Sequence, residues 1–130
     1  MRAILCKEYG PAETLVIEDV TSPVVKGHGV KVRVKAAGLN IEGKYQLKPT
    51  MPFSPGGEMS GEVIEVGEKV TRFKPGDRVA GLTGYGAFAE EVVVPEQNIL
   101  PIPESMSDEK AAAFSMVYGT SYYALKQRAK

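Results

Sequence analysis

The sequence has very few of the side chains that form disulfides and transition-metal sites. It contains one cysteine, Cys6, and one histidine, His28. A structural zinc site needs about four nitrogen or sulfur ligands, and a catalytic site about three protein ligands. We therefore expect no intrachain disulfide, no zinc, and a reducing, cytoplasmic compartment. Cys6, in an expected strand, is interpreted as a small core residue, and His28, between two glycines, as a solvated loop residue.

Long apolar runs and an excess of one charge are absent as well. The longest apolar stretches, 92–94 and 111–114, are far too short to cross a bilayer. Sixteen basic residues balance sixteen acidic ones, so the net charge is zero. Neither nucleic acid nor a membrane is expected as a partner, because the chain has no charge excess that would attract them. Its 130 residues suit one globular domain.

Glycine and proline punctuate the first two-thirds of the chain at short intervals, which is typical of a β-rich fold. Val30, Val32 and Val34 alternate with basic residues, so this strand should have one buried and one wet face. A half-buried strand favours an antiparallel or barrel-like sheet. The expected strand segments are 2–9, 15–20, 30–36, 61–67, 73–80 (which opens with a Pro-Gly turn), 87–94 and 98–102. The pattern predicts a mainly β fold with C-terminal helices.

Helix is predicted near the C-terminal end. Ser107 is a suitable N-cap, followed by the acidic residues Asp108 and Glu109 and then by a run of alanines. Gly119 is expected to end this segment, and a second helix is expected to run from Thr120 to the end of the chain. Because the sequence stops inside an expected helix, without a cap or a loop, we expect a truncated chain.

Four stretches carry a resemblance to a known family: 34–40 (VKAAGLN), 55–63 (PGGEMSGEV), 66–70 (VGEKV) and 73–79 (FKPGDRV). In order and spacing they resemble the N-terminal domain of zinc-independent quinone oxidoreductases, and of their zinc-containing alcohol dehydrogenase cousins, in the medium-chain dehydrogenase/reductase superfamily. The segments 86–91 and 119–125 extend the match over nearly the whole chain. The resemblance implies that residues 1–130 form a GroES-like, partly open β-barrel that binds substrate. It also implies a cofactor-binding Rossmann domain that is absent from this chain.

At two positions the chain differs from the alcohol dehydrogenases. Those enzymes place a zinc-binding cysteine where this chain has Asn40, and a histidine where it has Gly57. The resemblance therefore implies a reaction without zinc, which favours reduction of an activated C=C bond or a quinone carbonyl by hydride from NADPH. Glu58 matches the acidic residue beside the zinc in those cousins. Without the metal we expect it to be a surface or loop-bracing carboxylate.

The glycine fingerprint of a dinucleotide-binding fold is missing. The candidates 56–61 and 81–86 lack its spacing, and neither is expected to open a helix, so the chain alone should bind NADPH weakly or not at all. The resemblance implies that Asn40 and Thr120 contact the nicotinamide end of the cofactor, since an amide and a hydroxyl suit a ribose or carboxamide. From the residues alone, Asn40 is equally a turn residue and Thr120 equally a helix N-cap. No catalytic residue is assigned.

The segment after Asn40 departs from the family. Its members carry several more residues there, including a short helix that lines the active site and often a tyrosine, and 40–43 leaves no room for them. We expect either a deletion or residues that this sequence omits. Tyr45 is therefore not assigned to the site.

The leading hypothesis is the substrate-side domain of an NADPH-dependent, zinc-independent quinone or enone oxidoreductase, which acts on a small molecule and is a homo-oligomer when intact. The alternatives are an enoyl-thioester reductase of the same superfamily and a non-catalytic GroES-like interaction module. An apolar run near the end should form an exposed seam, unless it folds back into the core. It consists of Phe114, Met116, Val117, Tyr118, Tyr122 and Tyr123.

Overall fold

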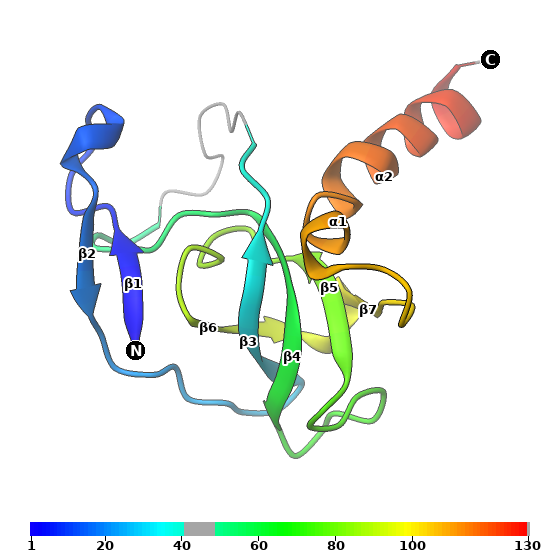
Figure 1. The fold of residues 1–130 in the computed structure, drawn as a ribbon, viewed down its shortest axis with the longest axis horizontal. Helices are drawn as coiled ribbons and strands as arrows, with labels where there is room; N and C mark the ends of the chain where they lie inside the picture. The colour runs from blue at the N-terminus through cyan, green and yellow to red at the C-terminus, as the bar shows by residue number, and fades with distance from the viewer. Residues whose placement is uncertain (41–48, 130) are drawn as a thin grey trace.

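The computed structural model describes residues 1–40 and 49–129, and Figure 1 shows how their elements are arranged. The strands are β1 (Arg2–Leu5), β2 (Val16–Asp19), β3 (Gly29–Ala37), β4 (Glu58–Val66), β5 (Arg78–Leu82), β6 (Glu91–Pro95) and β7 (Ile99–Pro101). The helical elements are α1 (Asp108–Ala112), α2 (Ser115–Tyr123), the short turns η1 (Ala12–Thr14) and η2 (Glu96–Asn98), and the π-helical η3 (Ala124–Arg128). The fold is mainly β with C-terminal helices, as predicted.

The main sheet is antiparallel and open. Its strand order is β6-β3-β4-β5-β7, so β6 and β7 form its two edges, while β1 and β2 pair in a separate ribbon. The register between β3 and β4 shifts between Lys31 and Val32 and again between Val34 and Ala36. Irregularities of this kind bend and twist a sheet. The described strands do not close on themselves, which confirms the predicted partly open barrel.

The inner faces of β3 and β4 form the centre of the core. Val30 and Val32 are fully buried and Arg33 is exposed, as the alternating pattern predicted. Burial of one such aliphatic side chain contributes about 1.5–3 kcal/mol to stability. The other buried members of the core are Met59, Val63, Phe73, Val79, Ala87, Val92, Val94 and Ile99. Because this face is almost wholly apolar, a one-residue slip of a strand would expose it, so the register is strongly specified.

Strand boundaries differ from the predicted ones, most informatively in β4, β1 and β6. β4 begins at Glu58 rather than at residue 61, and its first three residues are buried. Period-two alternation does not reveal such a segment, because both of its faces are covered. β1 ends at Leu5 rather than at residue 9. β6 begins at Glu91 rather than at residue 87, because the preceding residues bind the β1–β2 ribbon, with the Ile4 amide donating to the Phe88 carbonyl (2.8 Å).

The helical region is interrupted at a different residue from the one predicted. Ser107 caps α1 as expected, and its hydroxyl accepts a hydrogen bond from the Lys110 amide (3.3 Å). The chain then turns at Ala113, and α2 runs straight through Gly119. The prediction that Gly119 separates the helices was therefore wrong. A helical glycine costs about 1 kcal/mol relative to alanine, which a longer helix can tolerate.

Helix α2 projects away from the sheet (Figure 1), and none of its residues is buried. Its large apolar side chains and those of the adjoining residues are 48–73% exposed, namely Phe114, Val117, Tyr118, Tyr122, Tyr123 and Leu125. Phe114 and Tyr118 stack with ring centroids 4.8 Å apart. The apolar run therefore forms an exposed seam, except that Met116 is half-buried, and the alternative in which the run folds back into the core is wrong. No helix in the described part of the chain could cross a bilayer.

Gly119→Ala should stabilise α2. A Cβ at this position meets no atom within 4 Å, and the residue is already helical. Alanine loses less backbone entropy on forming a helix, so the local gain should be about 1 kcal/mol. Hydrogen exchange measured by NMR should slow about five-fold for the amides of residues 120–128, where local opening controls exchange. Unchanged or faster exchange there would contradict the helical conformation of Gly119.

Glu96 connects three segments that are distant in the sequence. It is buried, and its carboxylate accepts hydrogen bonds from the backbone amides of Thr71 and Arg72 (both 3.2 Å). Its Oε1 lies 2.9 Å from Nδ1 of His28. The bond from His28 is the largest cause that lowers the pKa of Glu96 below its usual value, and the two amides add to it. His28 is 64% exposed, as predicted for a loop histidine, but it is paired.

Acid should destabilise the fold through Glu96. Its pKa is lower in the folded chain than in the unfolded chain, so the unfolded state binds more protons between the two values. The stabilising effect is complete above the ordinary value of 4.5 and is lost as the pH falls through the folded-state pKa. Glu96→Gln should therefore flatten the dependence of the unfolding free energy on pH below about 4.5, measured by urea unfolding. Glu13→Gln, which changes an exposed carboxyl in η1, should keep the wild-type slope.

The lone thiol departs from its expected place. Cys6 is half-buried rather than a core residue, and its Sγ donates to the Glu8 carbonyl (3.2 Å). It follows the end of β1, where the chain leaves the core, and this explains its partial exposure.

Candidate functional site

The end of β3, the start of β4 and the first turn of α2 meet at one buried carboxylate. Glu58 is the first residue of β4 and is 1% exposed. Its Oε1 accepts a hydrogen bond from Nδ2 of Asn40 (3.0 Å). Its Oε2 accepts one from the backbone amide of Met116 (3.0 Å). A single side chain therefore links the loop after β3 to the helix that carries Thr120.

The position of Glu58 corrects one half of its prediction and supports the other. The side chain is buried, so the prediction of a surface carboxylate was wrong. It does brace a loop, because it holds the Asn40 amide. The burial follows from the early start of β4, whose N-terminal residues are covered by α1.

A buried carboxylate is stable here because both of its oxygens have donors. Met116 is the second residue of α2, and the first amides of a helix have no partner inside it. Phe114, at the N-cap position, provides no side-chain hydrogen bond, so Glu58 caps α2 from a distant strand. The positive end of the helix dipole also favours a negative charge at this place. Without the carboxylate, each unsatisfied donor would cost about 1–3 kcal/mol.

Gly38 leaves the space that the Glu58 side chain occupies. A Cβ at Gly38 would lie 2.3 Å from Oε1 and 2.6 Å from Cγ of Glu58. The Gly38 amide also donates to the Glu58 carbonyl (3.1 Å), so the two backbones are held together. Because Glu58 is enclosed, its side chain cannot move aside and keep its bonds to Asn40 and Met116. Only glycine fits at this position.

Gly38→Ala should therefore destabilise the fold by about 1–3 kcal/mol, the usual cost of overpacking. Urea unfolding measures the change, and the Met116 amide should lose protection from exchange at the same time. Gly119→Ala is the matched control, since it makes the same chemical change where no atom lies within 4 Å. A Gly38→Ala variant as stable as the wild type would show that Glu58 does not fill this space.

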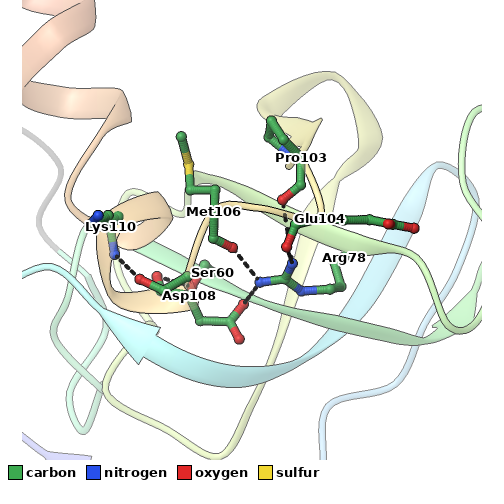
Figure 2. Close-up of polar contacts among 8 residues, drawn as sticks. Ser60, Arg78, Pro103, Glu104, Met106, Asp108 and Lys110 are labelled. Carbon is green, nitrogen blue, oxygen red and sulfur yellow. Dashed lines mark hydrogen bonds and ion pairs between the residues drawn. The ribbon is translucent and has the colours of Figure 1, made fainter.

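Arg78 holds the segment that leads into α2. Figure 2 shows its guanidinium group directed at backbone carbonyls between residues 103 and 106 and at the Asp108 carboxylate (3.1 Å). Ser60, on β4, donates from its hydroxyl to the Asp108 carbonyl (2.6 Å). Strands β4 and β5 thus fix α1 at its first residue. This anchoring places the start of α2 beside the buried carboxylate.

Among the described residues, the two predicted cofactor residues, Asn40 and Thr120, do not contact each other through a hydrogen bond. They are connected through Glu58, which binds Asn40 and the helix that carries Thr120. Asn40 is half-buried and is bound to Glu58 by its amide nitrogen. Thr120 is exposed and lies one turn beyond Met116, about 6 Å along the helix axis. It lies in the middle of α2, so its expected place in the first turn, and the alternative of an N-cap, are both wrong.

The two side chains that could meet a ligand at this place, Asn40 and Thr120, are neutral and polar. Over residues 1–40 and 49–129 no three His, Cys, Asp or Glu side chains are grouped as a metal site requires. The glycine-rich segments 56–61 and 81–86 enter β4 and leave β5, so neither opens a helix. In the first turn of α2 the Met116 amide is already bound to Glu58, and this carboxylate disfavours a second anion beside it. Asn40 and Thr120 carry an amide and a hydroxyl, which fit the ribose or carboxamide of a nicotinamide cofactor.

Comparison with known proteins identifies the family. Residues 26–104 match the family described as "Alcohol dehydrogenase GroES-like domain". Over 98% of its length the chain is 46% identical to the quinone oxidoreductase-like protein 2 homolog of Nematostella vectensis. The chain belongs to the alcohol dehydrogenase GroES-like domain family, and the relatives that it resembles are quinone oxidoreductases of the medium-chain dehydrogenase/reductase superfamily. This GroES-like chain spans 37% of the Nematostella relative's length.

Solved structures confirm the GroES-like fold. A quinone oxidoreductase of Pseudomonas syringae superposes with a TM-score of 0.91 at 38% identity, over 97% of this chain and 41% of that one. The Escherichia coli quinone oxidoreductase, determined as a complex with NADPH, gives a TM-score of 0.91 at 28% identity, over 98% of this chain and 41% of that one. The predicted fold and family are therefore correct.

The relatives contain residues that this GroES-like chain lacks. The alignment with the Nematostella relative runs over 136 positions, although the chain has 130 residues. This difference agrees with the expectation of additional residues in the family. The place predicted for them, after Asn40 and around Tyr45, lies outside the described residues.

The importance of Glu58 and Gly38 was missed from the sequence. Both belong to the stretches that carry the family resemblance, 55–63 and 34–40. An acidic residue among glycines and apolar residues is the signal that could have indicated burial. Its partner Met116 was not detectable, because a backbone amide has no sequence signature.

Proposed function

We propose that residues 1–130 form the substrate-side domain of an NADPH-dependent quinone or enone oxidoreductase that works without zinc. The observation that carries the proposal is Asn40, an amide held by Glu58 where the alcohol dehydrogenases have a zinc-binding cysteine. The similarity to quinone oxidoreductases over nearly the whole chain supports the reaction class. NADPH is the favoured cofactor because the similar E. coli enzyme was determined with it.

In this proposal Asn40 and Thr120 bind the nicotinamide end of the cofactor, and a Rossmann domain outside this sequence binds its phosphates. The cofactor, when bound, supplies the hydride. The chain's own residues orient the nicotinamide and shape the pocket for a small quinone or enone, so that the reacting atoms are held close together. Neutral donors and acceptors suit this task, because they position a ribose or carboxamide without a new buried charge.

Two further properties are proposed from the resemblance and the composition. The intact enzyme is a homo-oligomer, which sedimentation of the full-length protein would test. Its compartment is the cytoplasm, in keeping with a single cysteine in the chain. Neither property changes the proposed chemistry.

A domain exchange tests the function. The chain replaces the corresponding segment of the Nematostella relative, with which it shares 46% identity. The chimera should oxidise NADPH when a quinone such as 1,4-benzoquinone is supplied, and the 130-residue chain alone should not exceed a heat-treated control. Asn40→Ala in the chimera should lower kcat/KM about ten-fold or more, since a positioned hydrogen bond to the cofactor is lost.

The same chimera separates the alternatives. A higher kcat/KM for a crotonyl thioester than for quinones would favour the enoyl-thioester reductase. A folded chimera without activity toward either acceptor would favour a non-catalytic interaction module. Metal analysis completes the test, because about one equivalent of tightly bound zinc per chain would contradict a zinc-independent enzyme.

A further inference from the structure

We propose that Glu58 is the positioning residue of this site, because its carboxylate sets which end of the Asn40 amide faces the ligand. The identity of the ligand rests on the function proposed above. The orientation of Asn40 is a property of the chain itself and is testable without a ligand. Glu58 acts through Asn40 and α2 and does not touch the reacting atoms.

The orientation follows from the donors and acceptors at Glu58. An ionised carboxylate accepts hydrogen bonds and donates none. The Met116 amide, which is a donor, meets Oε2, and the only donor on the Asn40 side chain is its Nδ2, which meets Oε1. Reversal of the Asn40 amide would place its oxygen against a carboxylate oxygen. Asn40 is therefore locked with Nδ2 inward.

The ligand-facing group of Asn40 is then its Oδ1, an acceptor. The partner of an acceptor must be a hydrogen-bond donor, such as a carboxamide N–H or a ribose hydroxyl. A carboxylate or phosphate oxygen at the same place would be repelled, because it has no proton to donate. The buried carboxylate therefore selects for a neutral donor group and against an anionic one.

Oε2 of Glu58 fixes the position of α2 at the site. It fixes the Met116 amide, and Thr120 follows one turn later on the same helix. The hydroxyl of Thr120 has no protein partner among the described residues. Because one side chain holds both elements, loss of the whole Glu58 carboxylate should alter Asn40 and the start of α2 together, whereas a change of one oxygen should alter one of them.

Hydrogen exchange of side-chain amides tests the orientation in the unmodified chain. Asn98 is the second asparagine of the sequence and is exposed, so it serves as an internal reference. The bound NH2 proton of Asn40 should exchange about ten-fold or more slowly than those of Asn98, because it is donated to a buried carboxylate. Equal exchange rates would overturn the proposal. This measurement needs no variant, so it tests the orientation of the Asn40 amide even if a variant fails to fold.

Glu58→Gln gives the sharper test. The introduced glutamine side chain has only one oxygen, and this oxygen must accept the hydrogen bond from the fixed Met116 amide. The NH2 group of the glutamine is then left facing Asn40. Asn40 should then reverse and expose its own NH2 group. Its side-chain exchange should rise to the Asn98 rate while the Met116 amide stays protected. A simple loss of structure would raise both rates, and slow exchange at Asn40 in this variant would contradict the mechanism.

Glu65→Gln is the matched control on the same strand. Glu65 is exposed and pairs with Lys31, and no hydrogen bond or ion pair joins it to Asn40 or α2 among the described residues. Its carboxylate is solvated, so loss of this ion pair should cost little. Its removal should leave the exchange of Asn40 and Met116 unchanged.

The chimera distinguishes failure of this inference from failure of the proposed function, because the isolated chain is expected to bind NADPH weakly or not at all. In the chimera the KM for NADPH should rise about ten-fold on Glu58→Gln, because a donor then faces a donor. Slow exchange at Asn40 in the isolated chain, with the same KM for NADPH in the wild-type and Asn40→Ala chimeras, would reject the proposed cofactor contact but uphold the positioning role. A KM raised by Asn40→Ala but unchanged by Glu58→Gln would reject the positioning role and uphold the contact.

Discussion

The carboxylate of Glu58 is the constraint on which the arrangement of the C-terminal helices and the β3 loop depends. A charged group with 1% exposure has to be matched by donors on both oxygens, and among the described residues two segments supply them. Gly38 must lack a side chain to admit it, and α2 must begin where its amide can reach it. The apolar core stabilises the sheet, but this polar contact determines where the loop and the helix lie relative to it.

This arrangement separates two tasks that a nicotinamide enzyme has to perform. The N-terminus of α2, which is a favourable place for an anion, is occupied by a carboxylate of the chain itself. The groups that remain available, an amide and a hydroxyl, suit the uncharged parts of a cofactor. In the proposed enzyme the phosphates are therefore bound elsewhere, and this chain contributes orientation and pocket shape. The acidic residue that lies beside zinc in the alcohol dehydrogenases has a structural partner here that does not depend on a metal.

The sequence patterns correctly predicted the structural elements that depend on neighbouring residues. The alternation of valines and basic residues marked β3 and its wet face, and Ser107 followed by acidic residues marked the start of α1. The patterns failed where both faces of a strand are covered, as at the start of β4, and where a distant contact sets the boundary of a helix, as at Ala113. Gly119 was misjudged because helix propensity is a weak effect that a capped helix overrides.

By itself the sequence determined the family, the mainly β architecture and the two residues, Asn40 and Gly57, that stand where zinc ligands stand in the alcohol dehydrogenases. These properties follow from residue identities and from patterns among neighbouring residues, and both can be read in the sequence. Only the tertiary structure decided that Glu58 is buried, that it joins Asn40 to α2, and that Thr120 lies in mid-helix. The physical reason is that hydrogen bonds between residues 18 and 58 positions apart form only after the strands have aligned, and one of their donors is a backbone amide that every residue except proline has.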